Sequence, residues 1–232
     1  ARGTGSMLLG AITEKYKREG KSALGMFFSY QVQLVFLTAV PIIFGGILLA
    51  EDIIPVLYGP DYISVVSLVI ALFLVRFFTG FGGTYSAVLV ALEKPQYFLW
   101  TKIISMINIP LNILLIPRIG VIGAVIATAI AHLLTMSAQI FLTYRIASLK
   151  FPFTNVFKML LCGGIMLVGV FLFKELVNID IMELKLFLEI LLGACIYVFA
   201  VLNLNALDEE IWKFMPTKIV RMRNRIKINR VL

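Results

Sequence analysis

The chain has 232 residues, of which 60% are hydrophobic and 15% are charged, and its formal net charge is +8. A soluble globular domain is about 45–50% apolar with about 25% charged residues, and a soluble fold of this size has too little interior for the excess apolar surface. The composition therefore excludes an ordinary soluble domain and predicts an integral membrane protein, mostly helical. Cys162 and Cys195 form no CxxC pattern, so they indicate neither a metal site nor a redox compartment.

Six apolar segments are long enough to cross a membrane, because a helix needs about 20 apolar residues to span about 30 Å of hydrocarbon. In chain order they are 28–50, 63–92, 97–116, 119–144, 157–173 and 184–204. Proline and turn residues separate them, as in YGPDY at 58–62 and PRIG at 117–120. Proline removes a backbone donor, and lipid does not tolerate unsatisfied backbone groups. We therefore expect most of these breaks at the water interface.

The segments predict three parts of the chain. Residues 1–27 are expected to be the end of a preceding helix and a cytoplasmic loop, residues 28–204 a six-helix transmembrane bundle, and residues 205–232 a basic cytoplasmic tail. The first residue is Ala1 rather than Met, and no cleavable signal is visible. We expect the sequence to be a fragment that lacks an N-terminal part.

The basic residues predict the orientation, because Lys and Arg favour cytoplasmic loops. Sixteen of them fall in alternate loops on one side, whereas the other side holds Arg118, Lys174 and Lys185. Both ends of the chain are therefore predicted to be cytoplasmic. The tail can lie on anionic lipid. It could also bind RNA, but beside six spans we expect no nucleic-acid partner.

One arginine interrupts the second segment. Arg76 lies about 13 residues into it, which is near mid-membrane at about 1.5 Å per residue. A central arginine costs about 2.5–3.5 kcal/mol on insertion scales. Nothing acidic lies within a turn or two of it. Its partner is expected to be water, another helix or an anionic ligand, and a ligand-binding role and a packing role are equally favoured.

Two successive segments carry polar stripes. Residues spaced 4, 3 and 4 apart share one face of a helix. Those of the third segment are Thr101, Ser105, Asn108 and Asn112, and those of the fourth are Thr128, His132, Thr135 and Gln139. Such stripes can be hydrogen-bond contacts between helices or the lining of an aqueous path, and we favour the lining. His132 by itself is more typical of packing than of a proton relay, and the first segment adds Gln31, Gln33 and Thr38.

Acidic residues and catalytic motifs are missing from the predicted helix cores. Glu189 falls near the end of the sixth segment and is expected at the interface. Proton- or sodium-coupled carriers commonly use buried carboxylates. The sequence contains no HExxH, P-loop, Ser/His/Asp set or paired catalytic carboxylates. We therefore expect no enzyme activity, no cofactor and no metal site.

The hairpin between the third and fourth segments carries a family pattern. The pattern has an asparagine and LLIP at the end of one helix, a loop with glycine, and small residues at the start of the next helix. Its residues here are Asn112, Leu114, Leu115, Ile116, Pro117, Gly120, Gly123, Ala124, Ala127 and Thr128. The YG turn at 58–62 and the entry at 91–113 are also similar. Over about residues 26–149 the chain resembles the C-terminal half of polysaccharide-unit flippases of the multidrug/oligosaccharidyl-lipid/polysaccharide exporter superfamily.

This resemblance implies an all-α fold with about six transmembrane helices that form most of one lobe of a two-lobed carrier. It implies export of undecaprenyl-pyrophosphate-linked oligosaccharide across the bacterial inner membrane by alternating access, for surface polysaccharides such as O-antigen and lipopolysaccharide. Expected partners are the lipid-linked oligosaccharide, membrane lipids, a missing N-terminal lobe and the polysaccharide polymerase machinery. Arg76 would pair with pyrophosphate, and the sugar or water would meet Asn108, Asn112, Thr128, His132, Gln139 and Gln31.

Three rival functions are kept. A drug or metabolite antiporter of the same superfamily predicts buried carboxylates. A non-transporting scaffold, or an inactive remnant, in a polysaccharide-assembly complex predicts that the polar stripes only join helices and that Arg76 tolerates substitution. A membrane-bound acyl- or glycosyltransferase would need a catalytic cluster, which the sequence does not contain.

Overall fold

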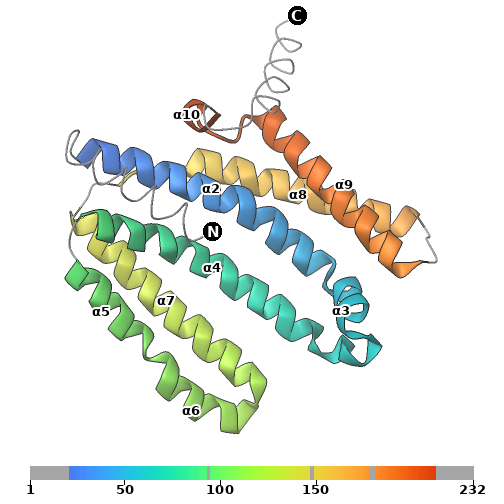
Figure 1. Ribbon diagram of the computed structural model, residues 1–232, viewed down its shortest axis with the longest axis horizontal. Coiled ribbons are helices and arrows are strands. Elements are labelled where there is room, and N and C mark those ends of the chain that lie inside the picture. Colours follow the sequence, from blue (N-terminus) through green and yellow to red (C-terminus); the bar gives the residue numbers. More distant parts are fainter. Residues whose placement is uncertain (1–20, 93–94, 147–148, 178–180, 213–232) are drawn as a thin grey trace, which may run out of the picture. The chain divides into compact units, whose positions relative to one another are not determined.

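The computed structural model of the chain describes residues 21–92, 95–146, 149–177 and 181–212, and within these ranges every regular element is a helix (Figure 1). The elements are α2 (Lys21–Leu48), α3 (Ala50–Tyr58), the 3₁₀ helix η1 (Pro60–Val65), α4 (Val66–Ala91), α5 (Pro95–Ser105), α6 (Asn108–Ile119), α7 (Val121–Ile146), α8 (Phe153–Leu176), α9 (Met182–Leu204) and α10 (Glu209–Trp212).

Several of these helices match the predicted spans. Among the described residues, the stretches that are long and apolar enough to cross a membrane are Leu24–Leu48, Leu99–Ile119, Val121–Arg145, Phe153–Leu176 and Met182–Leu204. The second predicted segment, 63–92, coincides with the end of η1 and with α4. The expectation of an all-α integral membrane fold is confirmed.

The described helices form two compact units. The first contains α2 up to Val35, α4 from Ala71, and α5, α6 and α7. The second contains the rest of α2, α3, η1, the first turn of α4, and α8, α9 and α10. In the first unit, α7 contacts both α5 and α6. The ring centroids of Phe28 on α2 and Tyr85 on α4 lie 5.0 Å apart.

The third predicted segment, 97–116, is not one straight helix. It divides into α5 and α6 at Met106 and Ile107, whose backbone N–H groups donate to the carbonyls three residues earlier. Pro110 explains the break, because it has no N–H for the carbonyl of Met106 and its ring crowds that carbonyl. Hydropathy alone missed this break, since both pieces are equally apolar.

The hairpin at PRIG is tighter than predicted. Pro117 and Arg118 still belong to α6, and Gly120 alone makes the turn, with φ +64° and its N–H donating to the carbonyl of Ile116 at 2.9 Å. Positive φ favours glycine. Arg118 is exposed, and its expected place at a membrane surface stays a prediction.

The sequence also missed the helical structure that follows the first span. Residues 50–65, which were expected as the end of a helix and a turn, form α3 and η1 on either side of Gly59. The predicted preceding helix and loop lie in residues 1–20, outside the described part, except that α2 already begins at Lys21. Of the predicted tail, residues 205–212 are described and include α10, and the remaining residues lie outside.

Helix α8 packs in the second unit through glycines. A Cβ atom on Gly163 would lie 2.5 Å from Cγ1 of Val40 and 2.8 Å from the ring of Phe44, both on α2. A real Cβ does not approach so closely, so the two helices can touch there only because residue 163 has no side chain. By contrast, a Cβ on the neighbouring Gly164 would meet nothing within 4 Å.

We therefore expect Gly163→Ala to destabilise the protein by about 1–3 kcal/mol, the usual range for overpacking a well-packed core. Gly164→Ala is the matched control and should leave stability nearly unchanged. Thermal unfolding of both variants in detergent or lipid measures the difference. Equal unfolding midpoints for the two variants would contradict the close contact between α8 and α2.

The loops that were predicted to lie on the same side of the membrane meet in the second unit. Lys174 at the end of α8 pairs with Asp52 of α3, 122 residues earlier. At the other end of α8, Asn155 donates to Asp208 at 3.0 Å, and Lys158 donates to the carbonyl of Asn205 at 3.4 Å. These contacts agree with the predicted sorting of loops into two sides. Which side faces the cytoplasm stays a prediction.

Candidate functional site

The clearest polar site of the first unit joins α6 to α7. Asn108 donates from Nδ2 to Oγ1 of Thr128 at 3.3 Å, and Asn112 donates from Nδ2 to Oδ1 of Asn108. Thr128 donates in turn to the carbonyl of Ala124 at 2.7 Å. The stripes predicted on two separate segments are therefore brought together at three of their residues.

The hairpin explains why these residues meet. Gly120 reverses the chain, and Gly123 then lets α7 start directly against α6, because a Cβ there would lie 2.6 Å from the carbonyl carbon and oxygen of Leu115. Ala127 and Ala131 follow at intervals of four residues and are buried. This ridge of small residues is typical of close helix contacts in membranes. Asn108 and Thr128, 20 residues apart in the chain, thereby reach hydrogen-bond distance.

A second polar contact lies further along α7. Gln139 is buried and donates from Nε2 to Oγ of Ser86 on α4 at 2.8 Å. It lies 11 residues after Thr128, which is about 16 Å along a helix. The polar stripe on α7 therefore forms hydrogen bonds with two different helices, with α6 at Thr128 and with α4 at Gln139.

Some polar atoms of these contacts are unsatisfied. Within the described part of the chain, Oδ1 of Asn112, Oε1 of Gln139 and Oγ1 of Thr84 are buried without a hydrogen-bond partner. A buried polar atom without a partner is costly, and water or a ligand hydroxyl could satisfy each of these oxygens. The site is thus a partly satisfied network, which can both join helices and accept hydrogen bonds from a polar ligand.

Three other predicted site residues, His132, Gln31 and Arg76, lie on α7, α2 and α4. His132 lies one turn after Thr128 on α7 and is half-buried, and Gln31 is half-buried on α2. No described contact joins Gln31 to Asn108, Asn112 or Thr128. Arg76 belongs to α4, but its side chain lies outside the described residues.

One functional candidate was missed by the sequence analysis. Glu189 was expected at the interface, but its side chain is fully buried at the eighth position of α9. Its expected place at the membrane interface stays a prediction, and what the sequence did not reveal is its burial within the protein. The spacing of Leu186, Glu189, Gly193 and Tyr197, all buried on α9, could have revealed it as part of a core-facing stripe.

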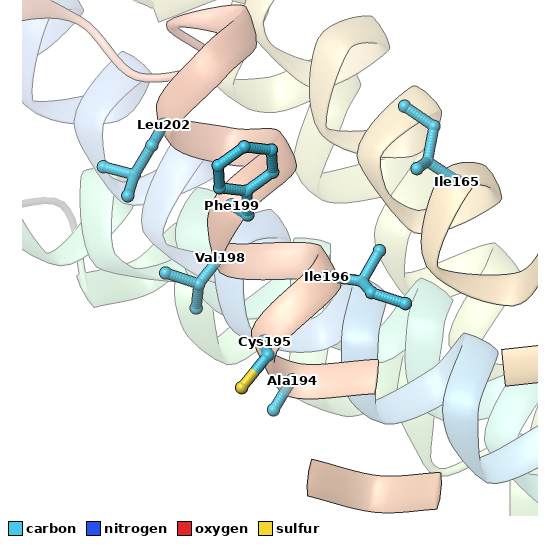
Figure 2. Close-up of a pocket in the computed structure, with 7 residues that line it drawn as sticks. All are labelled: Ile165, Ala194, Cys195, Ile196, Val198, Phe199 and Leu202. Carbon is cyan, nitrogen blue, oxygen red and sulfur yellow. The ribbon is translucent and has the colours of Figure 1, made fainter. Parts of the chain in front are cut away.

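The surface of α9 also carries an apolar groove. It has a volume of about 630 Å³ and is lined by Ile165 of α8 and by side chains of α9 between residues 194 and 202 (Figure 2). Its labelled lining residues are all apolar apart from Cys195. Exposed apolar surface of this kind suits contact with lipid chains, whereas it offers no donors for a sugar. The groove is therefore separate in chemistry from the polar site on α6 and α7.

The fold and these sites define an all-helical, multi-pass membrane protein. No protein-family model matches the chain. Among curated proteins it is 27% identical over 224 residues to an uncharacterized membrane protein of Methanocaldococcus jannaschii, covering 94% of this chain and 43% of that protein. It is 31% identical over 172 residues to the probable flippase AglR of Haloferax volcanii, covering 72% of this chain and 36% of AglR.

One further curated protein and one solved structure are also similar to this chain. The probable low-salt glycan biosynthesis flippase Agl15 of Haloferax volcanii is 24% identical over 178 residues, covering 76% of this chain and 38% of Agl15. Among solved structures, lipid II flippase MurJ in an inward closed conformation matches with a TM-score of 0.68 and 23% identity, over 84% of this chain and 41% of MurJ. The MurJ match shows a shared fold. The chain spans about two-fifths of the length of the curated relatives it matches.

Proposed function

We propose that this chain is part of a carrier that flips lipid-linked oligosaccharides across a membrane by alternating access. The observation that carries the proposal is the similarity to two proteins named as flippases, which covers most of this chain. The finer part of the proposal follows the family resemblance. In this finer part, the lipid carrier is undecaprenyl-pyrophosphate and the cargo is an oligosaccharide repeat unit for surface polysaccharide. The protein lies in the bacterial inner membrane, and both ends of this chain face the cytoplasm.

The polar network on α6 and α7 supports this function chemically. Sugar hydroxyls both donate and accept hydrogen bonds, and the buried oxygens of Asn112 and Gln139 have no hydrogen-bond donor within the described part of the chain. We assign contacts with the sugar head group, or with the water around it, to six residues: Asn108, Asn112, Thr128, Gln139, His132 and Gln31. Arg76 is assigned to the pyrophosphate, since guanidinium binds such oxygens in bidentate fashion.

An oligosaccharide-binding role for Asn112 predicts that Asn112→Ala lowers flipping three- to tenfold, the equivalent of about 0.5–1.5 kcal/mol for one hydrogen bond. The thermal midpoint should change little. Flipping of a fluorescent lipid-linked oligosaccharide by the full-length protein in proteoliposomes measures the first quantity. Asn203→Ala is the control, because Asn203 lies on α9 and donates to the carbonyl of Phe199 on the same helix. If Asn112→Ala lowers stability and leaves flipping intact, the network joins helices, as the scaffold function requires.

The antiporter remains the second candidate, and one observation favours it. It predicts buried carboxylates, and Glu189 is one. Transport assays with the same proteoliposomes separate the two functions, because an antiporter would exchange a soluble drug or metabolite for a cation without moving lipid-linked sugar. Flipping of lipid-linked sugar with no such exchange would exclude the antiporter.

A further inference from the structure

The second unit contains an acidic side chain with no visible partner. Glu189 is 0% exposed on α9, and neither of its carboxyl oxygens has a hydrogen-bond partner within the described part of the chain. Burial of a carboxyl group is costly unless it is paired, bonded or neutral. The arrangement therefore requires an explanation that packing alone does not supply.

Helix α8 packs closely against α9 one turn from this carboxyl group. One turn beyond Glu189, a Cβ on Gly193 would lie 3.1 Å from Val170 and 3.7 Å from Met166, both on α8. Leu186 precedes Glu189 on the same buried face. Glu189 thus belongs to an apolar helix contact, where an ionised carboxylate would lose its hydration without replacement.

Charged groups nonetheless surround the site from three elements. Asp52 on α3, Lys174 on α8 and Lys185 on α9 all lie within electrostatic range of Glu189. Each is already engaged, since Lys174 pairs with Asp52 and Lys185 donates to the carbonyl of Lys174 at 3.5 Å. Lys185 is also four residues before Glu189, so both side chains rise from one face of α9. The bond of Lys185 to that carbonyl is long, and it can exchange for a bond to Glu189.

We propose that Glu189 is a proton-binding site that is neutral in this arrangement and takes Lys185 as its partner when the proton leaves. The carboxyl O–H releases its proton to water at the end of the unit where Asp52 lies. The Lys185 ammonium keeps its own proton, leaves the carbonyl at the end of α8 and pairs with the new carboxylate. Proton release therefore breaks the hydrogen bond by which Lys185 of α9 is joined to the end of α8. The inference holds whatever cargo the chain carries.

A metal cation fits this site less well than a proton. Hard cations take several oxygen ligands, and Asp52, the neighbouring carboxylate within the described residues, is already paired with Lys174. Two ammonium groups nearby would repel a bound cation. Within the described residues, no group of three or more His, Cys, Asp or Glu side chains could hold a metal ion.

Infrared difference spectroscopy tests the proposal directly. The full-length protein in lipid is titrated with pH, and the carbonyl band of protonated carboxylic acids is followed. We expect one such band to be lost in Glu189→Gln and kept in Glu183→Gln, a control at an exposed glutamate on the same helix. Lys185→Gln should extend this band to higher pH, because the carboxylate then lacks its partner, whereas Lys102→Gln, at an exposed lysine, should not.

Three results would overturn this proposal or a part of it. If a folded Glu189→Gln retains every carboxylic acid band of the wild type at all pH values, the site does not bind a proton. Glutamine has the shape and neutrality of the protonated acid, so a Glu189→Gln protein that fails to fold, beside a folded Glu183→Gln, would also overturn the proposal. An unchanged titration in Lys185→Gln would overturn the exchange of partners.

Discussion

Arg76→Ala is expected to lower flipping of lipid-linked oligosaccharide at least about 30-fold. Removing one partner of a buried, hydrogen-bonded charge pair costs about 2–5 kcal/mol, and each 1.4 kcal/mol is a factor of ten. Arg76 lies about 13 residues into the second predicted span, where a charge is costly unless it is paired with a ligand or with another part of the protein. Arg76→Lys should give an intermediate rate, because lysine keeps the charge but lacks the bidentate fork.

Arg118→Ala is the matched control, since Arg118 is exposed at the end of α6. Its flipping rate should stay within about twofold of the wild type, in line with the small energies of exposed charges. Flipping in proteoliposomes and binding of the pyrophosphate-linked lipid should fall together in Arg76→Ala. Unchanged export by Arg76→Ala would contradict the ligand role, and lost stability with normal flipping would assign Arg76 to packing.

Gly123→Ala is expected to destabilise the protein by about 3 kcal/mol, at the upper end of overpacking effects. The added Cβ would lie 2.6 Å from the backbone of Leu115, and backbone cannot turn aside as the tip of a side chain can. The start of α7 must therefore move away from α6. Thermal unfolding should show a midpoint lower by roughly 6–12 °C, taking about 2–4 °C per kcal/mol for a chain of this size.

The same displacement should also weaken the polar network. Thr128 lies five residues after Gly123, so an opened hairpin carries it away from Asn108. Gly83→Ala is the control, because a Cβ there meets nothing within 4 Å, and its stability should change by no more than about 1 kcal/mol. A Gly123→Ala protein as stable as Gly83→Ala would contradict the close approach of α6 and α7.

The class of the protein, most of its spans and its main hairpin were predictable because they depend on local composition. A run of about 20 apolar residues is long enough to cross a membrane wherever it occurs, and five such helices are found among the described residues. The turn after α6 was predictable from PRIG, since a glycine with positive φ ends the helix there. The break before Asn108 was also encoded locally, by Pro110, but hydropathy does not register a missing backbone donor.

The pairing of side chains was decided only by the tertiary structure. The sequence by itself determined that Asn108, Asn112 and Thr128 lie on polar faces, and the close approach of α6 and α7 then joined them. The charge pattern likewise predicted Asp52 and Lys174 on the same side of the membrane, and folding paired them across 122 residues. The full burial of Glu189, near the close contact of Gly193 with α8, was likewise decided by the tertiary structure. Burial depends on which surfaces meet, and that is a property of helices distant in the chain.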